Sequence, residues 1–311
     1  MLISLTKVRE LDLSAPPSAG RPAHVSAASG LVRAGRFLYV VADDELHLGV
    51  FHATEAKAGH LIRLFPGELP APAKERKARK PDLEALALLP SFAGYPHGAL
   101  LALGSGSKRN RRMAALLALD AQGEAGDIPQ VCDLSGLFSV PEEIFAALNI
   151  EGAIVLGDEL CLLQRGNKRT VENAVVRFQL SALLDVLGAG RPIAAAESLI
   201  PSAICPVVLG EIEGIPLCFT DAAALPSGEF VFAAIAEDTE DNYNDGPCKG
   251  AALGIADRQG RLRCLYRLDR SHKIEGVHAD LEGGTLRLLL VTDGDDPAIA
   301  AGLYTASLPI L

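Results

Sequence analysis

Short apolar segments recur in pairs along the chain, and a turn joins the two members of each pair. Around Glu151 the sequence reads IEGAIVL, then Gly-Asp, then ELCLLQ. Segments of about four to eight residues that are bounded by turn residues and rich in Val, Leu and Ile favour strands over helices. Because both segments are apolar at nearly every position, we expect neighbouring sheets to cover both faces of each hairpin.

The same paired pattern occurs five times, and each copy opens on a small or acidic residue. Aligned on Glu151, the other copies open at Ser29, Glu84, Asp221 and Glu275, so the intervals are 55, 67, 70 and 54 residues. Two further apolar segments follow each of the first four copies; in the third copy they are residues 173–180 and 192–200. Repeats of this length with four strands each predict an all-β fold, a β-propeller with one blade per copy.

The fifth copy is short, since only 36 residues follow Glu275, and 28 residues precede Ser29. The two pieces add to one ordinary repeat, so residues 1–12 are expected to complete the last blade. Such closure removes sheet edges that invite aggregation. We therefore predict a five-bladed β-propeller, a single domain over residues 1–311 with blades starting near residues 29, 84, 151, 221 and 275. The pattern leaves open six blades, a β-sandwich or two smaller β domains.

Charge and composition narrow the range of partners. The formal net charge is −10, whereas nucleic acids and anionic membranes require a basic surface. No apolar run approaches the roughly 18–20 residues that span a bilayer, and the N-terminus does not resemble a signal peptide. The six cysteines are scattered, which suits free thiols in a reducing cytosol. We expect a cytoplasmic protein with a small polar or anionic ligand, without a nucleic-acid or membrane partner; the oligomeric state stays open.

The residues that open the five copies are the candidate metal site. In a propeller the first strand of each blade lines the central channel, so these residues are expected to form one ring. Four of the five are acidic, and carboxylates at close range raise one another's pKa unless a cation, a shared proton or a donor ligand compensates them. Hard cations prefer oxygen ligands, so the cofactor expected here is Ca²⁺. Its predicted ligands are Glu84, Glu151, Asp221 and Glu275.

Further polar residues are expected around the same mouth of the channel, because the second strand of each hairpin returns to the end where the first began. The candidate catalytic groups are Glu237 or Asp293 as general base and Arg165 as a clamp for an anionic substrate. Residues 237–250 are acidic and turn-rich and predict a lid or surface loop. The loop GSGSKRNRR gathers four more cations, Lys108, Arg109, Arg111 and Arg112. The candidate substrate-binding residues are Ser29, Asp43, Lys108, Arg109, Asn167 and Lys273.

Several phrases carry a family resemblance, among them DLEALALLP, GSGSKRNRR, NIEGA, TDAAALPSGEFVFAAIAED and KIEGV. Together they resemble an uncharacterised family of bacterial β-propeller proteins over nearly the whole chain. More distantly they are similar to the esterase-like phytase domain, in which an acidic-Gly phrase also opens the blades. That likeness implies an acidic, calcium-binding channel and hydrolysis of phosphoesters or esters. The sequence departs from the pattern at Ser29, where an acidic residue is expected.

Two functions of different class follow from these patterns. The first is a calcium-dependent hydrolase of a phosphoester, ester or lactone, with its site at the mouth of the channel. The alternative is a propeller without catalytic activity, in which Arg165, Lys273 and Arg109 pair with the carboxylates and the mouth holds a small polar ligand or a protein partner. In a third interpretation the ring contains only water and binds no ligand. Metal analysis of the purified protein separates the first from the others.

Overall fold

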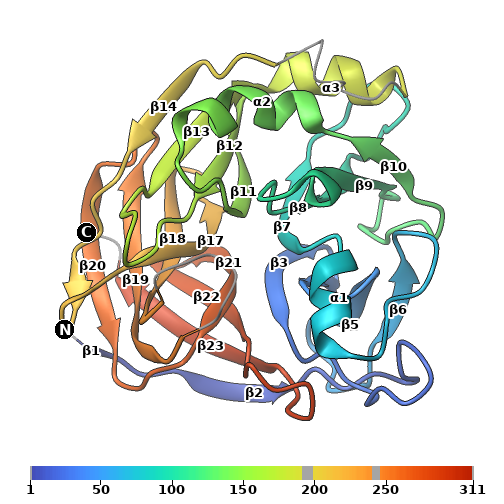
Figure 1. Ribbon diagram of the computed structural model, residues 1–311, viewed down its shortest axis with the longest axis horizontal. Coiled ribbons are helices and arrows are strands. Elements are labelled where there is room, and N and C mark those ends of the chain that lie inside the picture. Colours follow the sequence, from blue (N-terminus) through green and yellow to red (C-terminus); the bar gives the residue numbers. More distant parts are fainter. Residues whose placement is uncertain (1, 191–198, 240–245, 310–311) are drawn as a thin grey trace.

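A computed structural model of the 311-residue chain describes residues 2–190, 199–239 and 246–309. It is a five-bladed β-propeller, seen face-on in Figure 1, in which five sheets surround a central axis. Within each blade the strands are antiparallel. The innermost strands β3, β7, β11, β17 and β21 contact one another in a closed ring. The prediction of five blades is confirmed.

The first two blades follow the chain without interruption from the axis outward. Blade one comprises β3 (Ala28–Ala34), β4 (Phe37–Ala42), β5 (His47–His52) and β6 (His60–Arg63). Blade two comprises β7 (Leu83–Leu89), β8 (Ala99–Gly104), β9 (Met113–Ala118) and β10 (Gln130–Asp133). Two short helices, α1 (Ala73–Arg79) and the 3-10 helix η1 (Arg109–Arg111), lie in the connections.

Blades three and four carry longer connections. Blade three comprises β11 (Ile150–Leu156), β12 (Glu159–Gln164), β13 (Ala174–Gln179) and β14 (Ala203–Pro206), with α2 (Ser135–Ile144) before it and α3 (Leu180–Gly188) before its outer strand. Blade four comprises β17 (Cys218–Ala224), β18 (Glu229–Glu237), β19 (Cys248–Asp257) and β20 (Leu262–Leu268), preceded by the hairpin β15 (Glu211–Ile212) and β16 (Ile215–Pro216).

Some predicted segments fall elsewhere. The outer strand of blade three, expected at residues 192–200, is β14, and residues 192–198 lie outside the described residues. The same holds for residues 240–245 of the predicted lid.

The last blade is closed by strands from both ends of the chain. It comprises β21 (Ile274–Glu282), β22 (Thr285–Thr292), β23 (Gly302–Pro309) and, as its outer strand, β2 (Thr6–Glu10). The predicted N-terminal closure is therefore present. It differs in one respect, because β1 (Leu2–Ile3) leaves the last blade and pairs in parallel with β20 at the outer edge of blade four.

Apolar side chains fill the spaces between blades, as the two-sided apolar strands predict. The described residues form five buried hydrophobic clusters, and each joins two adjacent blades. Phe219 and Phe232, for example, meet edge to face in the cluster between blades three and four. Cysteines take part as small apolar residues, and all six are free thiols. None of the described helices has the length and apolar content to cross a bilayer.

Every innermost strand has the same irregularity near its start. The pairing register skips one residue, a β-bulge, at Ser29, Glu84, Glu151, Thr220 and Glu275. A bulged residue is unpaired and its side chain is re-aimed. In blade four the bulged residue is Thr220 rather than Asp221, so the sequence alignment of that blade is displaced by one position. Because side chains alternate across a strand, one position decides which direction a side chain takes.

Candidate functional site

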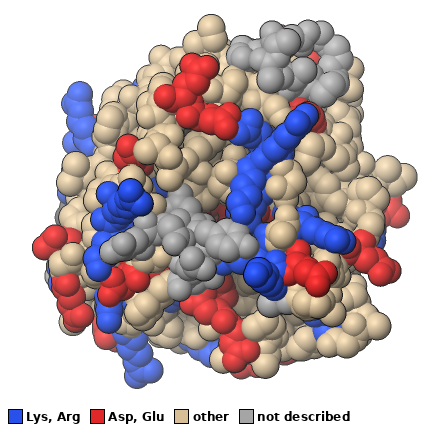
Figure 2. Space-filling model, viewed as in Figure 1, with Lys and Arg blue, Asp and Glu red and all other residues tan. Residues whose placement is uncertain are grey.

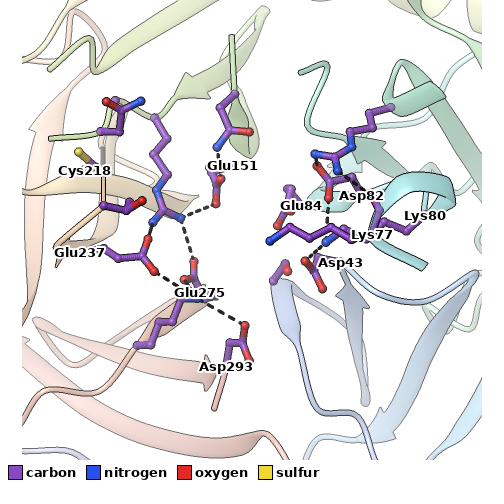
Figure 3. A pocket seen from close by; sticks show the side chains of 18 residues that line it. Asp43, Lys77, Lys80, Asp82, Glu84, Glu151, Cys218, Glu237, Glu275 and Asp293 are labelled. Atoms are coloured by element: carbon purple, nitrogen blue, oxygen red, sulfur yellow. Dashed lines mark hydrogen bonds and ion pairs between the residues drawn. The ribbon is translucent and has the colours of Figure 1, made fainter. Parts of the chain in front are cut away.

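The bulges surround a polar cavity of about 80 Å³ at one mouth of the channel. Figure 3 shows its side chains converging from all five blades and from α1. Its lining includes seven carboxylates and five cationic groups: Asp43, Asp82, Glu84, Glu151, Glu237, Glu275 and Asp293, with Lys77, Lys80, Arg111, Arg165 and Lys273. On the face of the molecule drawn in Figure 2, side chains of both charge signs are interspersed. The cavity therefore combines excess negative charge with close internal compensation.

Arg165 joins three blades through their carboxylates. It follows β12, and its Nη1 donates to Glu151 Oε2 at 3.1 Å while its Nη2 donates to Glu237 Oε2 at 2.5 Å. Glu275 Oε2 lies 3.9 Å from Nη1. Burial opposes the charge of Arg165, but these three carboxylates outweigh it and raise the pKa of the guanidinium well above its usual value. Burial raises the pKa of Glu151, against the effect of Arg165.

Lys273 is the second internal cation, two residues before the bulge of blade five. Its Nζ lies 2.5 Å from Asp295 Oδ1, 3.6 Å from Asp293 Oδ2 and 3.8 Å from Glu275 Oε1. Burial raises the pKa of Asp293 to about 7, although Lys273 acts in the opposite direction. Burial also raises the pKa of Glu275 well above its ordinary value, because Arg165 and Lys273 are too distant to offset it.

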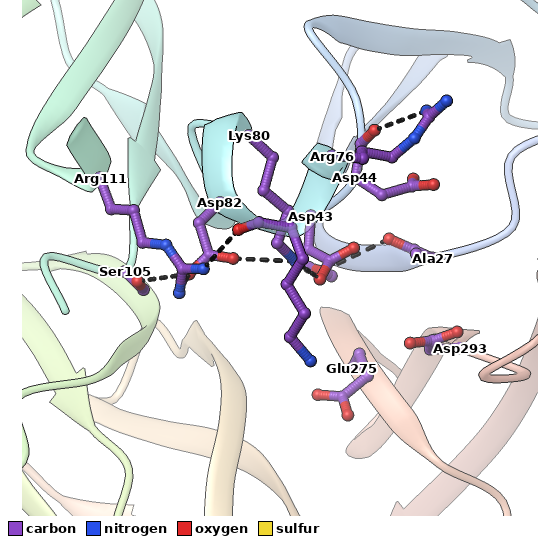
Figure 4. A network of polar contacts seen from close by, with 12 residues as sticks. Ala27, Asp43, Asp44, Arg76, Lys80, Asp82, Ser105, Arg111, Glu275 and Asp293 are labelled. Carbon is purple, nitrogen blue, oxygen red and sulfur yellow. Dashed lines mark hydrogen bonds and ion pairs between the residues drawn. The ribbon is translucent and has the colours of Figure 1, made fainter. Parts of the chain in front are cut away.

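A second charged cluster lies across the cavity, between blades one and two (Figure 4). Lys80 follows α1; its ammonium donates to Asp43 and lies 2.9 Å from Asp82 Oδ1. Asp82 also accepts at 2.6 Å from Arg111 and from the Ser105 hydroxyl. Burial raises the pKa of Asp43 to about 6, against the effect of Lys80. Asp82 has φ 59°, a left-handed conformation uncommon outside glycine, so the chain is bent to bring this carboxylate inward.

Glu84 differs from its neighbours because it has no hydrogen-bonding partner among the described residues. Burial, then the carboxylates of Glu151 and Asp82, raise its pKa well above the usual value. One carboxylate oxygen from each of Glu84, Asp43 and Asp82 lies within 4.8 Å of the other two, a spacing that fits a metal ion. The ammonium of Lys80 already contacts two members of this group.

The structure brings most of the predicted residues together. Ten of them line the cavity: Ser29, Asp43, Glu84, Glu151, Arg165, Asn167, Lys273, Glu237, Glu275 and Asp293. Asp221 does not, because the bulge falls at Thr220; its carboxylate instead accepts at 2.9 Å from the Val277 amide of the next blade. Lys108 and Arg109 are exposed beside η1, and their neighbour Arg111 is the cation that turns inward.

Sequence reasoning missed a second layer of lining residues. Asp82, Asn149, Cys218 and Lys273 each stand two positions before a bulge, where strand alternation places a side chain on the same face. Only Lys273 was predicted. Asn149 donates to the carboxylate of Glu151, and Cys218 is a protonated thiol, since burial raises its pKa to about 11. The charge run at residues 76–86 predicts a solvated approach to blade two, and that prediction is wrong for Lys80 and Asp82, which are both buried.

Comparison with solved structures finds propellers and other proteins at low identity. The chain is similar to hydrazine synthase of Kuenenia stuttgartiensis (10% identity, TM-score 0.39, covering 92% of this chain and 64% of that one). It is similar to the WD40 β-propeller domain of Doa1 (8%, 0.38, 94% and 96%) and to an α-L-arabinofuranosidase of Fusarium graminearum (9%, 0.45, 98% and 98%). With TM-scores below 0.5, none of these carries an argument about activity.

A comparison with proteins of curated function gave no match. One protein family does match, over residues 24–308 and thus nearly the whole propeller. The chain belongs to this family, which is described as a family of unknown function (DUF6929).

Proposed function

We propose that the protein is a binding propeller whose axial cavity takes a small polar ligand. The proposal rests on which carboxylates of the cavity have hydrogen-bonding or ion-pair partners and which do not. Most are fixed by Arg165, Lys273, Lys80 or Arg111, whereas Glu275 Oε1 is buried without a hydrogen bond and the partly buried Glu84 has no hydrogen-bonding partner among the described residues. Fixed charged groups around two unsatisfied acceptors are a preorganised arrangement, which reduces the ordering cost of binding.

The size and chemistry of the cavity favour a ligand with few heavy atoms. A water molecule occupies about 10–15 Å³ on a comparable measure, so about 80 Å³ corresponds to roughly five to eight such positions. The lining described contains no aromatic side chain, so recognition depends on hydrogen bonds and charge rather than on stacking.

Calcium-dependent hydrolysis of a phosphoester, ester or lactone is the second candidate. The cluster of Asp43, Asp82 and Glu84 favours it, since these oxygens are spaced for a hard cation. Asp293, whose pKa burial raises to about 7, suits a general base at neutral pH. Calcium at this cluster requires Lys80 to leave Asp43 and Asp82, so we place this candidate second.

Thermal unfolding of the purified protein with a panel of small compounds tests the choice. The panel holds short amines, amino acids, polyols, phosphoesters and lactones, each measured with calcium chloride and with a chelator. Binding predicts that one class raises Tm in wild type and not in Ser29→Leu, which fills the cavity. No shift with any class overturns the binding proposal. A calcium-dependent rise in Tm, lost in Asp82→Asn and accompanied by turnover of an ester, supports the hydrolase instead.

A further inference from the structure

Blade one places an uncharged residue in the ring of bulged residues that line the cavity, whereas the uncharged Thr220 of blade four does not line it. Ser29 stands at its bulge, and the neighbouring strands β7 and β21 carry Glu84 and Glu275 at theirs. The Ser29 hydroxyl is short and turns back toward its own chain, donating to the Ala27 carbonyl at 3.4 Å. The ring position of blade one therefore holds neither a carboxylate nor a cation, and it opens into the cavity.

The carboxylates that flank this position lack hydrogen-bonding partners among the described residues, although Glu275 Oε2 lies 3.9 Å from Arg165 Nη1. Glu275 has a side chain only 7% exposed, and its Oε1 atom is buried without a hydrogen bond; the Lys273 ammonium is 3.8 Å away. Glu84 has no hydrogen-bonding partner among the described residues. Asp43 and Asp293 end the second strands of blades one and five and line the same cavity; Figure 4 shows Glu275 and Asp293 beside Asp43. An unsatisfied buried acceptor costs free energy, which a ligand with donors recovers.

We infer that the ligand of this cavity is a small organic cation, a short primary alkylammonium compound, whose N–H groups donate to Glu84 and Glu275 beside Ser29. The inference rests on the proposed function, since it names the class of ligand that the same cavity takes. Two ammonium groups of the chain's own lysines already lie among carboxylates of this cavity. The ammonium of Lys80 lies between Asp43 and Asp82, and that of Lys273 lies among the acidic groups of blade five.

A primary ammonium fits better than other cations for two reasons. It offers three donors that point in different directions, so it can satisfy acceptors on separate blades. Its alkyl chain can leave through the mouth, where the Lys77 side chain from α1 already extends across the cavity (Figure 3). An inorganic cation would be drawn to Asp43, Asp82 and Glu84, which Lys80 occupies in part.

Titration calorimetry at pH 8 and constant ionic strength tests the inference on the full chain. The probes are methylammonium and butylammonium chloride, with 1-butanol as the neutral analogue, tetramethylammonium as a cation without N–H donors, and calcium chloride. We expect butylammonium to bind at least tenfold more tightly than 1-butanol and tetramethylammonium. Glu84→Gln and Glu275→Gln should each weaken butylammonium at least tenfold. Asp280→Asn, on the same strand β21 but outside this cavity, should leave the affinity unchanged.

A tethered ammonium gives a second test that does not depend on a soluble ligand. Ser29→Lys places an alkylammonium at the open position, and Ser29→Met is its uncharged control. We expect Ser29→Lys to have the higher Tm and to lose the response to butylammonium. Equal Tm values for the two variants contradict the inference. If butanol or a polyol binds as tightly as butylammonium, the cation is wrong while the binding function stands; if calcium alone binds, the inference fails and the hydrolase gains support.

Discussion

Replacing Arg165 by methionine tests whether the channel mouth is held together electrostatically. The substitution keeps most of the aliphatic volume and removes the guanidinium that joins blades three, four and five. It breaks the hydrogen bonds to Glu151 at 3.1 Å and to Glu237 at 2.5 Å, and leaves Glu275 without its nearest guanidinium. Both hydrogen-bonded carboxylates have side chains no more than 7% exposed, so bulk solvent has little access to compensate them when the guanidinium is removed.

The expected magnitude follows from that burial. Breaking a buried ion pair by removing one partner costs about 3–5 kcal/mol, because the other charge stays buried without compensation. We expect Arg165→Met to lower the free energy of unfolding by about this amount at pH 8. The loss should shrink as the pH falls, because the pKa of Glu151 is raised by burial and a protonated carboxylic acid no longer needs the guanidinium.

Urea unfolding at pH 8 and pH 5.5 measures both parts of this prediction. The control is Arg263→Met, which removes an ion pair to Glu229 in which the side chains are 58% and 31% exposed. Exposed pairs contribute about 0–1 kcal/mol, so the control should change little at either pH. If the dependence of the unfolding free energy on urea concentration is the same for variant and wild type, unfolding exposes the same surface area in both proteins. If Arg165→Met costs no more than the control, the mouth is solvated and the electrostatic reasoning is refuted.

Three further substitutions probe other parts of the mouth. Asp293, with a pKa raised to about 7 by burial, favours the folded state when protonated; this contribution is full below pH 4, declines as the pH rises through 7, and amounts to at most roughly 4 kcal/mol. Asp293→Asn should therefore flatten the loss of stability between pH 5 and pH 8 in urea unfolding, and an unchanged pH profile would contradict this. Lys80→Met leaves Asp43 and Asp82 without their shared ammonium, so calcium chloride should raise the Tm of the variant more than that of wild type; equal shifts would count against a latent cation site. Asp221→Asn weakens the acceptor of the Val277 amide and should cost about 1–3 kcal/mol in unfolding experiments, yet leave butylammonium affinity unchanged because residue 221 does not line the cavity.

The fold could be predicted from the sequence because its signal is repeated. The same hairpin pattern recurs in each blade. The last repeat has too few residues after Glu275, and the residues before Ser29 supply the missing strand, which is β2. Most of the ring could be predicted for the same reason, because Glu84, Glu151 and Glu275 begin equivalent strands and meet at the cavity. The repeat therefore identifies the blades and most of the ring, although it misplaced blade four by one position.

The remaining features depend on single residues, where repetition does not help. Thr220 and Asp221 are both polar, so the sequence does not show which of them the bulge of blade four re-aims. Lys80 follows α1 in a charge run typical of a solvated segment, and its burial depends on tertiary packing around α1, which Figure 1 draws in front of blade one. Asp82 turns inward through a left-handed backbone conformation that its residue type does not require.

The departures from the repeat, rather than the repeat itself, define what the cavity can bind. Four blades offer it the side chain at the bulge, and four offer the side chain two positions earlier; Thr220 of blade four and Ala27 of blade one do not line the cavity. Blades two, three and five fill these positions with charged or amide groups, whereas blade one offers only Ser29 and blade four only Cys218. Charge from blade one comes instead from Asp43, at the end of its second strand. A fivefold scaffold thus makes a ring of acceptors, and the uncharged position of blade one, on the strand between those of Glu84 and Glu275, leaves room for a positive group from outside the chain.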